Sequence, residues 1–242
     1  MEFKRSPYHY WYKYLNPDYK SESATPPQIL GNALHTYVLE PNEFDKRYFV
    51  IPKFNKVTKE GKERWQTIKS ELGNRETLSA DQYQTLQYMA ASFKKNKLVI
   101  QLIEKAEIEQ SLYWTDPDTG ILCKCRPDIL RPNLVGDLKT TKDGSAKAFS
   151  KTINEYCYHI QAAMIQEALK NIKQIIIKDF FFLIIEKKAP YATAIYPLDQ
   201  ASLEQGRYEF KKLLADYKQC LETNEWPSYE IQEISIPRYA FF

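Results

Sequence analysis

The chain has 242 residues, 43 % hydrophobic and 14 % aromatic, so it is long enough to bury one substantial core. Its formal net charge of +3 is too small to mark an obligate polyanion binder, although an uneven distribution could still create a basic surface. The longest apolar run, Phe180 to Ile185, is far shorter than the roughly 20 residues of a membrane span. The N-terminus does not resemble a secretion signal, so we expect an intracellular protein with no membrane partner.

The cysteines do not form a recognisable metal module. In a reducing compartment all of them should be free thiols, and their spacing matches neither a zinc site nor an iron–sulfur cluster. They are Cys123, Cys125, Cys157 and Cys220.

The N-terminal third predicts two helices. Ser6 followed by Pro7 is a typical helix start and predicts a short aromatic helix to Leu15. After a loop, apolar residues recur at helical spacing between Pro27 and Leu39 and predict an amphipathic helix. On that helix Gly31 and His35 share one face.

The middle of the chain reads as a helical insertion, roughly residues 56–103, in a single domain over residues 1–242. A short strand is expected at 48–51, before the insertion. The charged stretch 56–71 predicts a loop that runs into a solvated helix. Ser79 and Gln82 form a capping-box pattern, which predicts a helix through Phe93.

The second half predicts the sheet. Alternating residues over 106–114 and 121–129, joined by turn residues at 116–120, predict a hairpin. The apolar run within 175–186 predicts a central strand, with a neighbour at 191–196. The other expected elements are a strand at 134–140 and helices at about 158–169 and 203–221. We therefore expect an α/β fold with a central mixed sheet flanked by helices.

Three residues on neighbouring strands suggest a reaction centre. Residues i and i+2 of a strand project from the same face, so Asp137 and Lys139 can both reach a site beside Asp128. Two carboxylates are suitable ligands for Mg²⁺, for which Mn²⁺ can substitute. The duller alternative is a surface ion pair, because a D-x-K pattern is frequent by chance.

Four further residues could complete this site, although each has a plain structural alternative. Glu109 could add a carboxylate, and His35 could ligate through its imidazole. Gln161 could orient phosphate or nucleophile, and Tyr158 lies on the same helical face. Alone, His35 suits a core position, Glu109 a polar strand face, and the other two a helix surface. Their joint order along helix, strands and helix favours one site at one end of a sheet.

The order of these residues resembles the PD-(D/E)xK nuclease superfamily, whose restriction-endonuclease-like core is the expected fold. The stretches of sequence around these residues resemble the exonuclease VIII (RecE-type) exonucleases of phages and prophages, which are related to phage lambda exonuclease. The matching stretches span residues 6–229 and are "SPYHYW", "GNALHTYVLEP", "EIEQSLYW", "CRPDIL", "GDLKTT", "YHIQAAM", "EKKAPYATAIYPLD" and "WPSY".

The resemblance implies a Mg²⁺-dependent exonuclease that enters at double-stranded DNA ends and degrades one strand 5′ to 3′. It implies a 3′ single-stranded tail, a single-strand annealing recombination protein as partner, a homo-oligomeric ring, and the cytoplasm of a bacterium or phage-infected host cell. The roles it implies are metal ligation by Asp128, Asp137, His35 and the Leu138 carbonyl, and catalysis by Lys139, Glu109, Gln161 and Tyr158.

The chain departs from the family pattern at two places. The helix motif often has a tyrosine four residues after the glutamine, where this chain has Ile165. The stretch before "SPYHYW" is also short, so Lys4 and Arg5, together with Arg126, are the candidates for contacts with DNA phosphates. The alternatives left open are an endonuclease or single-strand nuclease on the same scaffold, and a non-catalytic DNA-end-binding protein.

Overall fold

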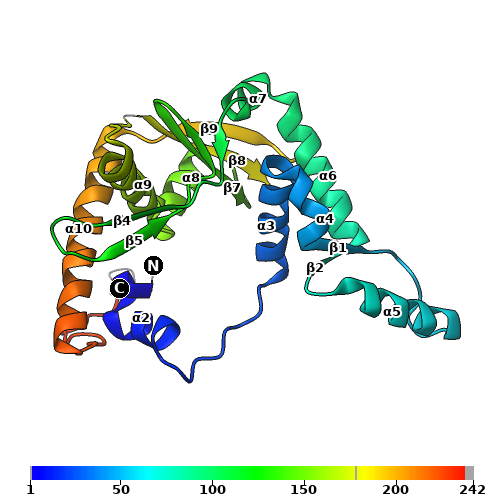
Figure 1. Cartoon of the computed structure of the whole chain (residues 1–242), viewed down its shortest axis with the longest axis horizontal. Coiled ribbons are helices and arrows are strands. Elements are labelled where there is room, and N and C mark those ends of the chain that lie inside the picture. Colours follow the sequence, from blue (N-terminus) through cyan, green and yellow to red (C-terminus); the bar gives the residue numbers. More distant parts are fainter. Residues whose placement is uncertain (1, 178, 238–242) are drawn as a thin grey trace.

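A five-stranded mixed sheet forms the centre of the molecule (Figure 1). The structure, a computed structural model, describes residues 2–177 and 179–237. Within this sheet of the described residues, β7 (Leu134–Thr141) and β8 (Asp179–Glu186) run parallel, and the other neighbouring strands are antiparallel. This confirms the expected α/β class with a mixed sheet between helices. In spatial order the strands are β3 (Glu107–Ile108), β6 (Ile129–Arg131), β7 (Leu134–Thr141), β8 (Asp179–Glu186) and β9 (Thr193–Pro197).

Strand β8 is buried on both faces, as its apolar run predicts. Phe180, Phe182 and Ile184 belong to one hydrophobic cluster, whereas the alternate residues from Phe181 to Ile185 belong to a second cluster on the opposite face. The predicted strand began earlier, at 175. In the structure β8 begins at Asp179, and position 178 lies outside the described residues.

Helices cover both faces of the sheet. The first cluster includes apolar residues of α8 (Ala146–Glu155), α9 (Tyr158–Lys173) and α10 (Gln200–Thr223). The second cluster includes residues of α3 (Pro26–Leu39) and α6 (Ala80–Lys95). The site described below lies where α3 and α9 approach the same strand, β7, from its two faces.

The predicted hairpin exists, but each of its long strands is broken in two. The backbone turns at Glu109, where φ is +53°, and separates β3 from β4 (Leu112–Thr115). Pro127 has no N–H to donate to a ladder, and it lies in the gap between β5 (Leu122–Cys125) and β6. As a result β4 and β5 form a separate two-stranded sheet, and β3 and β6 join the main sheet.

The N-terminal and middle segments contain more elements than the sequence predicts. Helix α2 (Pro7–Tyr14) is confirmed, and a short helix α1 (Glu2–Arg5) precedes it. The predicted β1 (Tyr48–Ile51) is confirmed and pairs in parallel with an unpredicted strand, β2 (Glu76–Ser79). The remaining short helices are η1 (Pro41–Glu43), α4 (Phe44–Arg47) and α7 (Lys97–Ile103).

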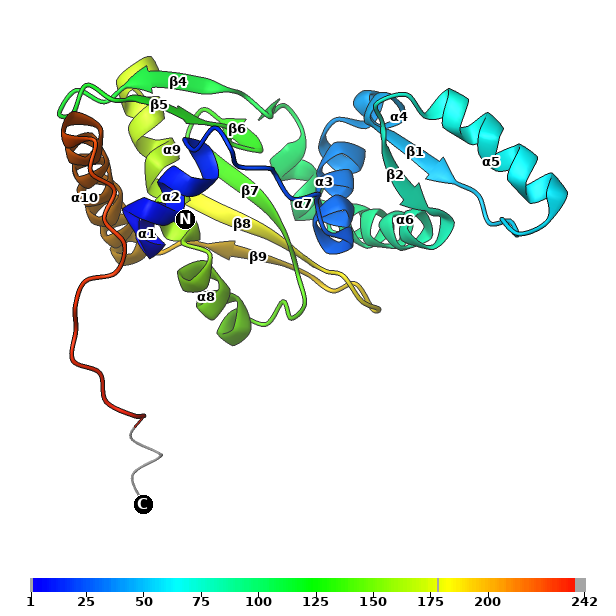
Figure 2. The ribbon, with the colours of Figure 1, turned by 90° about the horizontal axis from the view of Figure 1, so that it is seen from below.

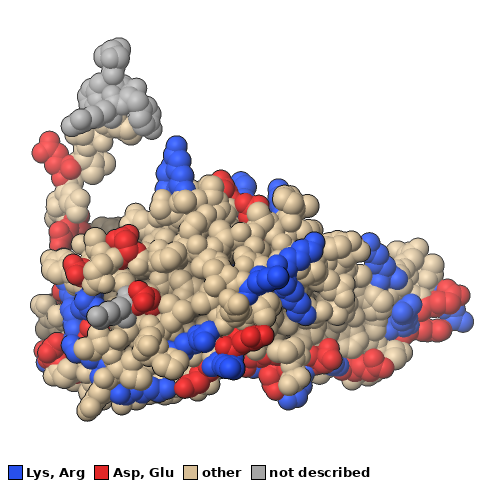
Figure 3. Space-filling view, turned by 90° about the horizontal axis from the view of Figure 1, so that it is seen from above, with Lys and Arg blue, Asp and Glu red and all other residues tan. Residues whose placement is uncertain are grey.

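The expected insertion contains α6 and α7, and also α5 (Lys59–Leu72) and the strand β2. The Ser79–Gln82 capping box that begins α6 is present. Helix α6 packs its apolar face into the core, whereas α5 lies at the end of the molecule opposite α10 (Figure 2). Acidic and basic side chains are interspersed over the face in Figure 3. Among the helices of the described residues, none is both long and apolar enough to cross a membrane.

Candidate active site

The site forms at an edge of β7 that no strand covers. Strand β6 pairs with β7 only as far as Gly136, so the following residues of β7 have no strand partner on that side within the described chain. The Leu138 N–H, which would otherwise be unpaired, donates to Asp128 Oδ2 at 2.7 Å. This bond fixes the first aspartate of the pattern beside the strand that carries the second.

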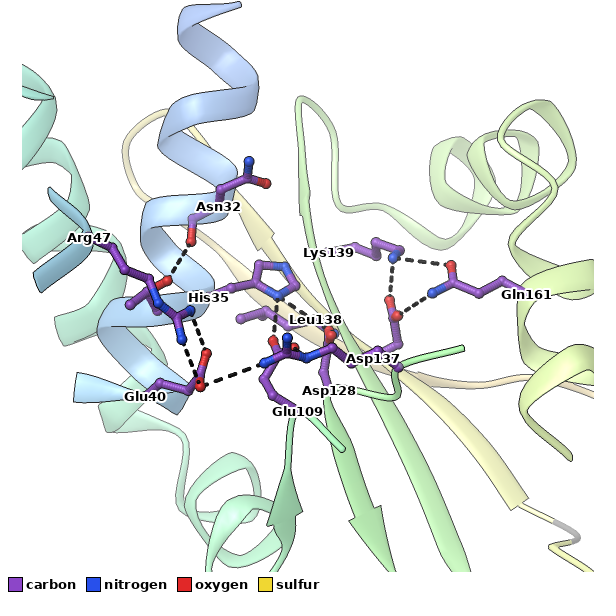
Figure 4. A network of polar contacts seen from close by, with 12 residues as sticks. Asn32, His35, Glu40, Arg47, Glu109, Asp128, Asp137, Leu138, Lys139 and Gln161 are labelled. Carbon is purple, nitrogen blue, oxygen red and sulfur yellow. Dashed lines mark hydrogen bonds and ion pairs between the residues drawn. The ribbon is translucent and has the colours of Figure 1, made fainter. Parts of the chain in front are cut away.

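Three potential metal ligands meet at this edge. His35 Nδ1 lies 3.4 Å from Asp128 Oδ2 and 3.8 Å from Glu109 Oε1 (Figure 4). One ligand atom from each residue lies within 4.8 Å of the other two. We call these three residues the His–acid cluster. The structure thus brings Glu109, expected as an auxiliary acid, next to two of the predicted metal ligands.

The position of His35 depends on a close approach of α3 to β7. A Cβ placed on Gly31 would lie 3.3 Å from Thr140 Oγ1, which is already a tight contact. His35 follows Gly31 by about one helical turn and so faces the same strand. The glycine therefore lets α3 lie close enough for His35 to reach Asp128.

The second half of the site lies on the α9 side of β7. Asp137 Oδ1 accepts a hydrogen bond from Gln161 Nε2 at 2.9 Å, and Asp137 Oδ2 lies 2.6 Å from Lys139 Nζ. Lys139 Nζ also donates to Gln161 Oε1 at 3.4 Å and lies 4.5 Å from the centroid of the Tyr158 ring. Tyr158 begins α9, and its ring stabilises the ammonium by a cation–π contact.

The donor set fits a hard divalent cation. Asp137 Oδ2 is buried, and the Lys139 ammonium, 2.6 Å away, compensates its charge. A buried carboxylate needs such a cation, and a divalent ion could share this carboxylate with the lysine. Together with Asp128 and Glu109, Asp137 offers the oxygen ligands that Mg²⁺ and Mn²⁺ prefer.

Burial and mutual repulsion also favour a cation here. Burial, and then the charge of Asp137, raise the pKa of Asp128 to about 7. Two buried carboxylates that repel each other need additional positive charge to remain ionised together. The pKa of Lys139 is raised, because Asp137 and Asp128 outweigh the effect of burial, so the lysine is an ammonium at neutral pH.

The His–acid cluster has its own charge balance. Burial lowers the pKa of His35, but the neighbouring Glu109 and Asp128 outweigh it and raise the pKa. Burial raises the pKa of Glu109, but His35 and Arg126 outweigh it and lower the pKa. Glu109 is therefore an ionised carboxylate that can bind a cation.

Two arginines border the site on its outer side. Arg126 Nε lies 2.6 Å from Glu109 Oε2, and Arg47 donates to both oxygens of Glu40 at 2.8 and 3.1 Å. With His35 they line a pocket of about 290 Å³. The sequence reasoning missed Glu40 and Arg47. The sequence does contain a signal for them. Glu40 follows the last residue of α3, where the helix dipole disfavours an acidic side chain unless a cation such as Arg47 lies nearby.

The structure places Lys4 and Arg5 apart from the cluster. Lys4 Nζ lies 2.5 Å from Glu209 Oε2, and Arg5 Nε donates to the Tyr229 hydroxyl at 3.2 Å. Both line a different pocket, between α1, α10 and the C-terminal segment. Ile165, where the family pattern often has a tyrosine, is fully buried in the core. The roles of Lys4 and Arg5 in DNA binding stay predictions.

Comparisons with known proteins show the family and the fold of the chain. A crystal structure of a "Putative exonuclease" from Eubacterium rectale superposes with a TM-score of 0.60 at 12 % identity, covering 94 % of this chain and 84 % of that one. The structure of SSO0001 aligns with a TM-score of 0.30 at 16 % identity, covering 75 % of this chain and 85 % of that one, which is too low to indicate a shared fold. No curated protein matches the chain in sequence. The family model "PDDEXK-like domain of unknown function (DUF3799)" matches residues 1–235, and the chain belongs to that family.

Proposed function

We propose that the protein is a Mg²⁺-dependent exonuclease that degrades one strand of duplex DNA 5′ to 3′ from an end and leaves a 3′ single-stranded tail. The observation that carries this proposal is the meeting of Asp128, Asp137 and Lys139 at the uncovered edge of β7, with Gln161 bonded to Asp137. The structural neighbour described as a "Putative exonuclease" supports the reaction class, and the polarity rests on the resemblance in sequence.

The residues of the chain divide the work of phosphodiester hydrolysis. In this proposal Asp128, Asp137 and Glu109 hold divalent cations, with His35 as a further ligand. The grouping of His35, Glu109 and Asp128 supports it. A cation held by these residues would supply an acidified water and positive charge beside the phosphate. The Lys139 ammonium, held by Asp137 and Gln161, stabilises the negative charge that develops on the phosphate in the transition state. Burial lowers the pKa of Lys139, but the Asp137 and Asp128 carboxylates outweigh it and raise the pKa, so the side chain carries a positive charge beside them.

Two partners belong to the same proposal. The 3′ tail would be passed to a single-strand annealing protein, and copies of the chain would form a ring around DNA. Both rest on the resemblance in sequence. Light scattering of the purified protein tests the ring, and a mass corresponding to a monomer at micromolar concentration would contradict it.

The central experiment uses a blunt linear duplex labelled at the 5′ or the 3′ end in separate reactions. In Mg²⁺ we expect nucleotides to be released from the 5′ label first, and no release in EDTA. The same reaction on a 5′-dephosphorylated duplex tests whether the end phosphate is read. Release from the 3′ label first would contradict the proposed polarity.

Two controls separate the alternatives. A covalently closed circle offers no end, so cutting it as fast as the linear duplex would indicate an endonuclease, and preference for a single strand would indicate a single-strand nuclease. An Asp137→Asn variant should lose at least about 100-fold in rate, because the charge at the cation site falls. A parent protein that binds DNA ends without cutting them would be a non-catalytic end-binding protein.

A further inference from the structure

The segment around α5 carries more basic than acidic residues. Residues 53–76 contain seven Lys and Arg against four Glu, a net charge of +3, which equals the net charge of the whole chain. The rest of the chain contains 27 residues of each sign and is neutral as a whole. This segment comprises α5 and its flanking loops, at the end of the molecule in Figure 2.

Three lysines follow one side of helix α5. Its apolar side buries Gly61 and Ile68. Lys59, Lys62 and Lys69 are exposed and follow a helical spacing of 3, 4 and 7 residues, with Gln66 completing the row. Glu63 follows Lys59 by four residues and borders this row, whereas Glu60 and Glu71 lie farther round the helix. We call Lys56, Lys59, Lys62 and Lys69 the lysine stripe.

The lysine stripe is not neutralised by the protein. Lys59–Glu63 and Glu60–Arg64 are spaced to form ion pairs along the helix, but neither pair forms. Within the described part of the chain, no carboxylate comes within 4.0 Å of a stripe lysine, whereas nearby Lys53 does pair with Asp81 at 2.6 Å. The four ammonium groups are therefore free to bind an external anion.

An aromatic ring and a fixed loop hold part of the stripe in place. Lys56 Nζ lies 3.9 Å from the centroid of the Trp65 ring, and Lys69 Nζ lies 5.8 Å from it. A Cβ on Gly61 would lie 1.7 Å from the Asn55 carbonyl oxygen, so the loop before α5 packs directly on the helix. The Trp65 ring draws two of the lysines together without cancelling their charge.

We propose that the lysine stripe binds the phosphate backbone of duplex DNA beside the cutting site. This proposal rests on the proposed function. Tyr48, which lines the site pocket, is the first residue of β1, and the chain runs from it to Lys59. A fully extended chain of eleven residues spans at most about 40 Å, so the near end of the stripe lies within roughly one turn of B-DNA of the pocket. A row of lysines on one helix face suits a regular row of phosphates and carries no base specificity.

The test compares two triple variants with equal loss of charge. Lys59→Gln/Lys62→Gln/Lys69→Gln removes three stripe lysines, and Lys94→Gln/Lys95→Gln/Lys97→Gln removes three exposed lysines near the start of α7. Binding of a fluorescent 30-base-pair duplex is measured in EDTA, so that no cleavage occurs, over a range of salt concentrations. A third variant, with arginine at 59, 62 and 69, retains the charge.

We expect the stripe variant to bind duplex DNA about 10-fold more weakly at about 0.1 M salt. The slope of log K against log salt concentration should become less negative by about 2 to 3. The control and the arginine variant should remain within about twofold of the parent. The cleavage rate at saturating DNA should be unchanged, because the stripe does not contact the reacting phosphate. Circular dichroism verifies folding of each variant.

Equal affinity and slope in the stripe variant and the parent would overturn this proposal alone, even if the parent degrades DNA. Loss of binding to vesicles containing anionic lipid, with duplex binding intact, would overturn it in favour of a membrane surface. A parent that binds duplex through the stripe but cuts no DNA would contradict the proposed function and leave the stripe supported.

Discussion

The Asp128 carboxylate accepts a 2.7 Å hydrogen bond from the Leu138 backbone N–H, in the middle of the D-x-K strand. Asp128, a predicted metal ligand, thus also accepts the hydrogen bond of a backbone N–H at the strand edge that no other described strand covers. The two roles can be separated by substitution, because asparagine retains an oxygen acceptor and alanine does not.

We expect Asp128→Asn to reduce the cleavage rate at least about 100-fold while the protein stays folded, since the amide oxygen can still accept from Leu138. Asp128→Ala should in addition lower the free energy of unfolding by about 1–3 kcal/mol, because the buried N–H loses its partner. Nuclease assays and urea denaturation measure the two effects. Equal stability of the two variants would show that the bond contributes nothing.

The ring of Tyr158 should matter more than its hydroxyl. Lys139 Nζ lies over the ring face, and Tyr158→Phe keeps that face. We expect Tyr158→Phe to retain activity within about threefold and Tyr158→Ala to lose about 10-fold or more, mainly in kcat, because the ammonium is no longer held in place. Lys139→Arg should also be impaired, since a planar guanidinium does not fit the same position. An inactive phenylalanine variant would contradict the cation–π role.

Glu109 offers a test of the His–acid cluster as a cation site. Glu109→Gln removes a charged oxygen ligand, so we expect Mn²⁺ affinity, measured by calorimetry, to fall about 10-fold. The matched control is Glu107→Gln, two residues earlier, where the carboxylate is exposed and pairs with Lys173. Identical Mn²⁺ affinities for the two variants would remove Glu109 from the cation site.

Much of this site could be predicted because the spacing of residues within single elements carries the information. The i, i+2 pair Asp137 and Lys139 does lie at one site, and Gln161 and Tyr158 do share a face of α9. The relation between Gly31 and His35 on α3 is also as the helical period predicts. Their roles in binding metal and in catalysis stay predictions.

What could not be predicted depends on long-range pairing. The break at Glu109 requires a positive φ that no local signal indicates for a glutamate. Strand β2 is short and pairs with β1 across more than 20 intervening residues, so its four residues show no distinctive period. Arg47 reaches Glu40 because η1 and α4 turn the chain back, and neither short helix is predicted from the sequence.

Gly136 should tolerate no side chain, because β7 passes close to an aromatic ring. A Cβ at this position would lie 2.2 Å from Phe181 Cζ. We expect Gly136→Ala to lower the free energy of unfolding by about 2 kcal/mol or more, and to impair cleavage through the adjacent Asp137. Combining it with Phe181→Leu should recover part of that loss. Full stability of the single variant, measured in urea, would contradict the close approach.

Glu209 should make the stability of the fold depend on acidic pH. Its carboxylate accepts hydrogen bonds from Lys4 at 2.5 Å and Gln205 at 2.9 Å, and lies 3.4 Å from His159 Nε2. Burial raises the pKa of Glu209, but the bonds from Lys4 and Gln205 outweigh it and lower the pKa to about 2. The ionised carboxylate therefore joins α1 and α9 to α10.

A lowered pKa in the folded state means that the stabilisation is fully present above pH 4.5, the ordinary value for the unfolded chain, and is lost as the pH falls towards 2. We expect Glu209→Gln to be less stable than the parent by roughly 1–3 kcal/mol at pH 7, with the difference shrinking below pH 4.5. Urea denaturation at pH 7, 5 and 3 measures this. A difference that stays constant over that range would show that the charge of Glu209 does not stabilise the fold, and that only the shape of its side chain does.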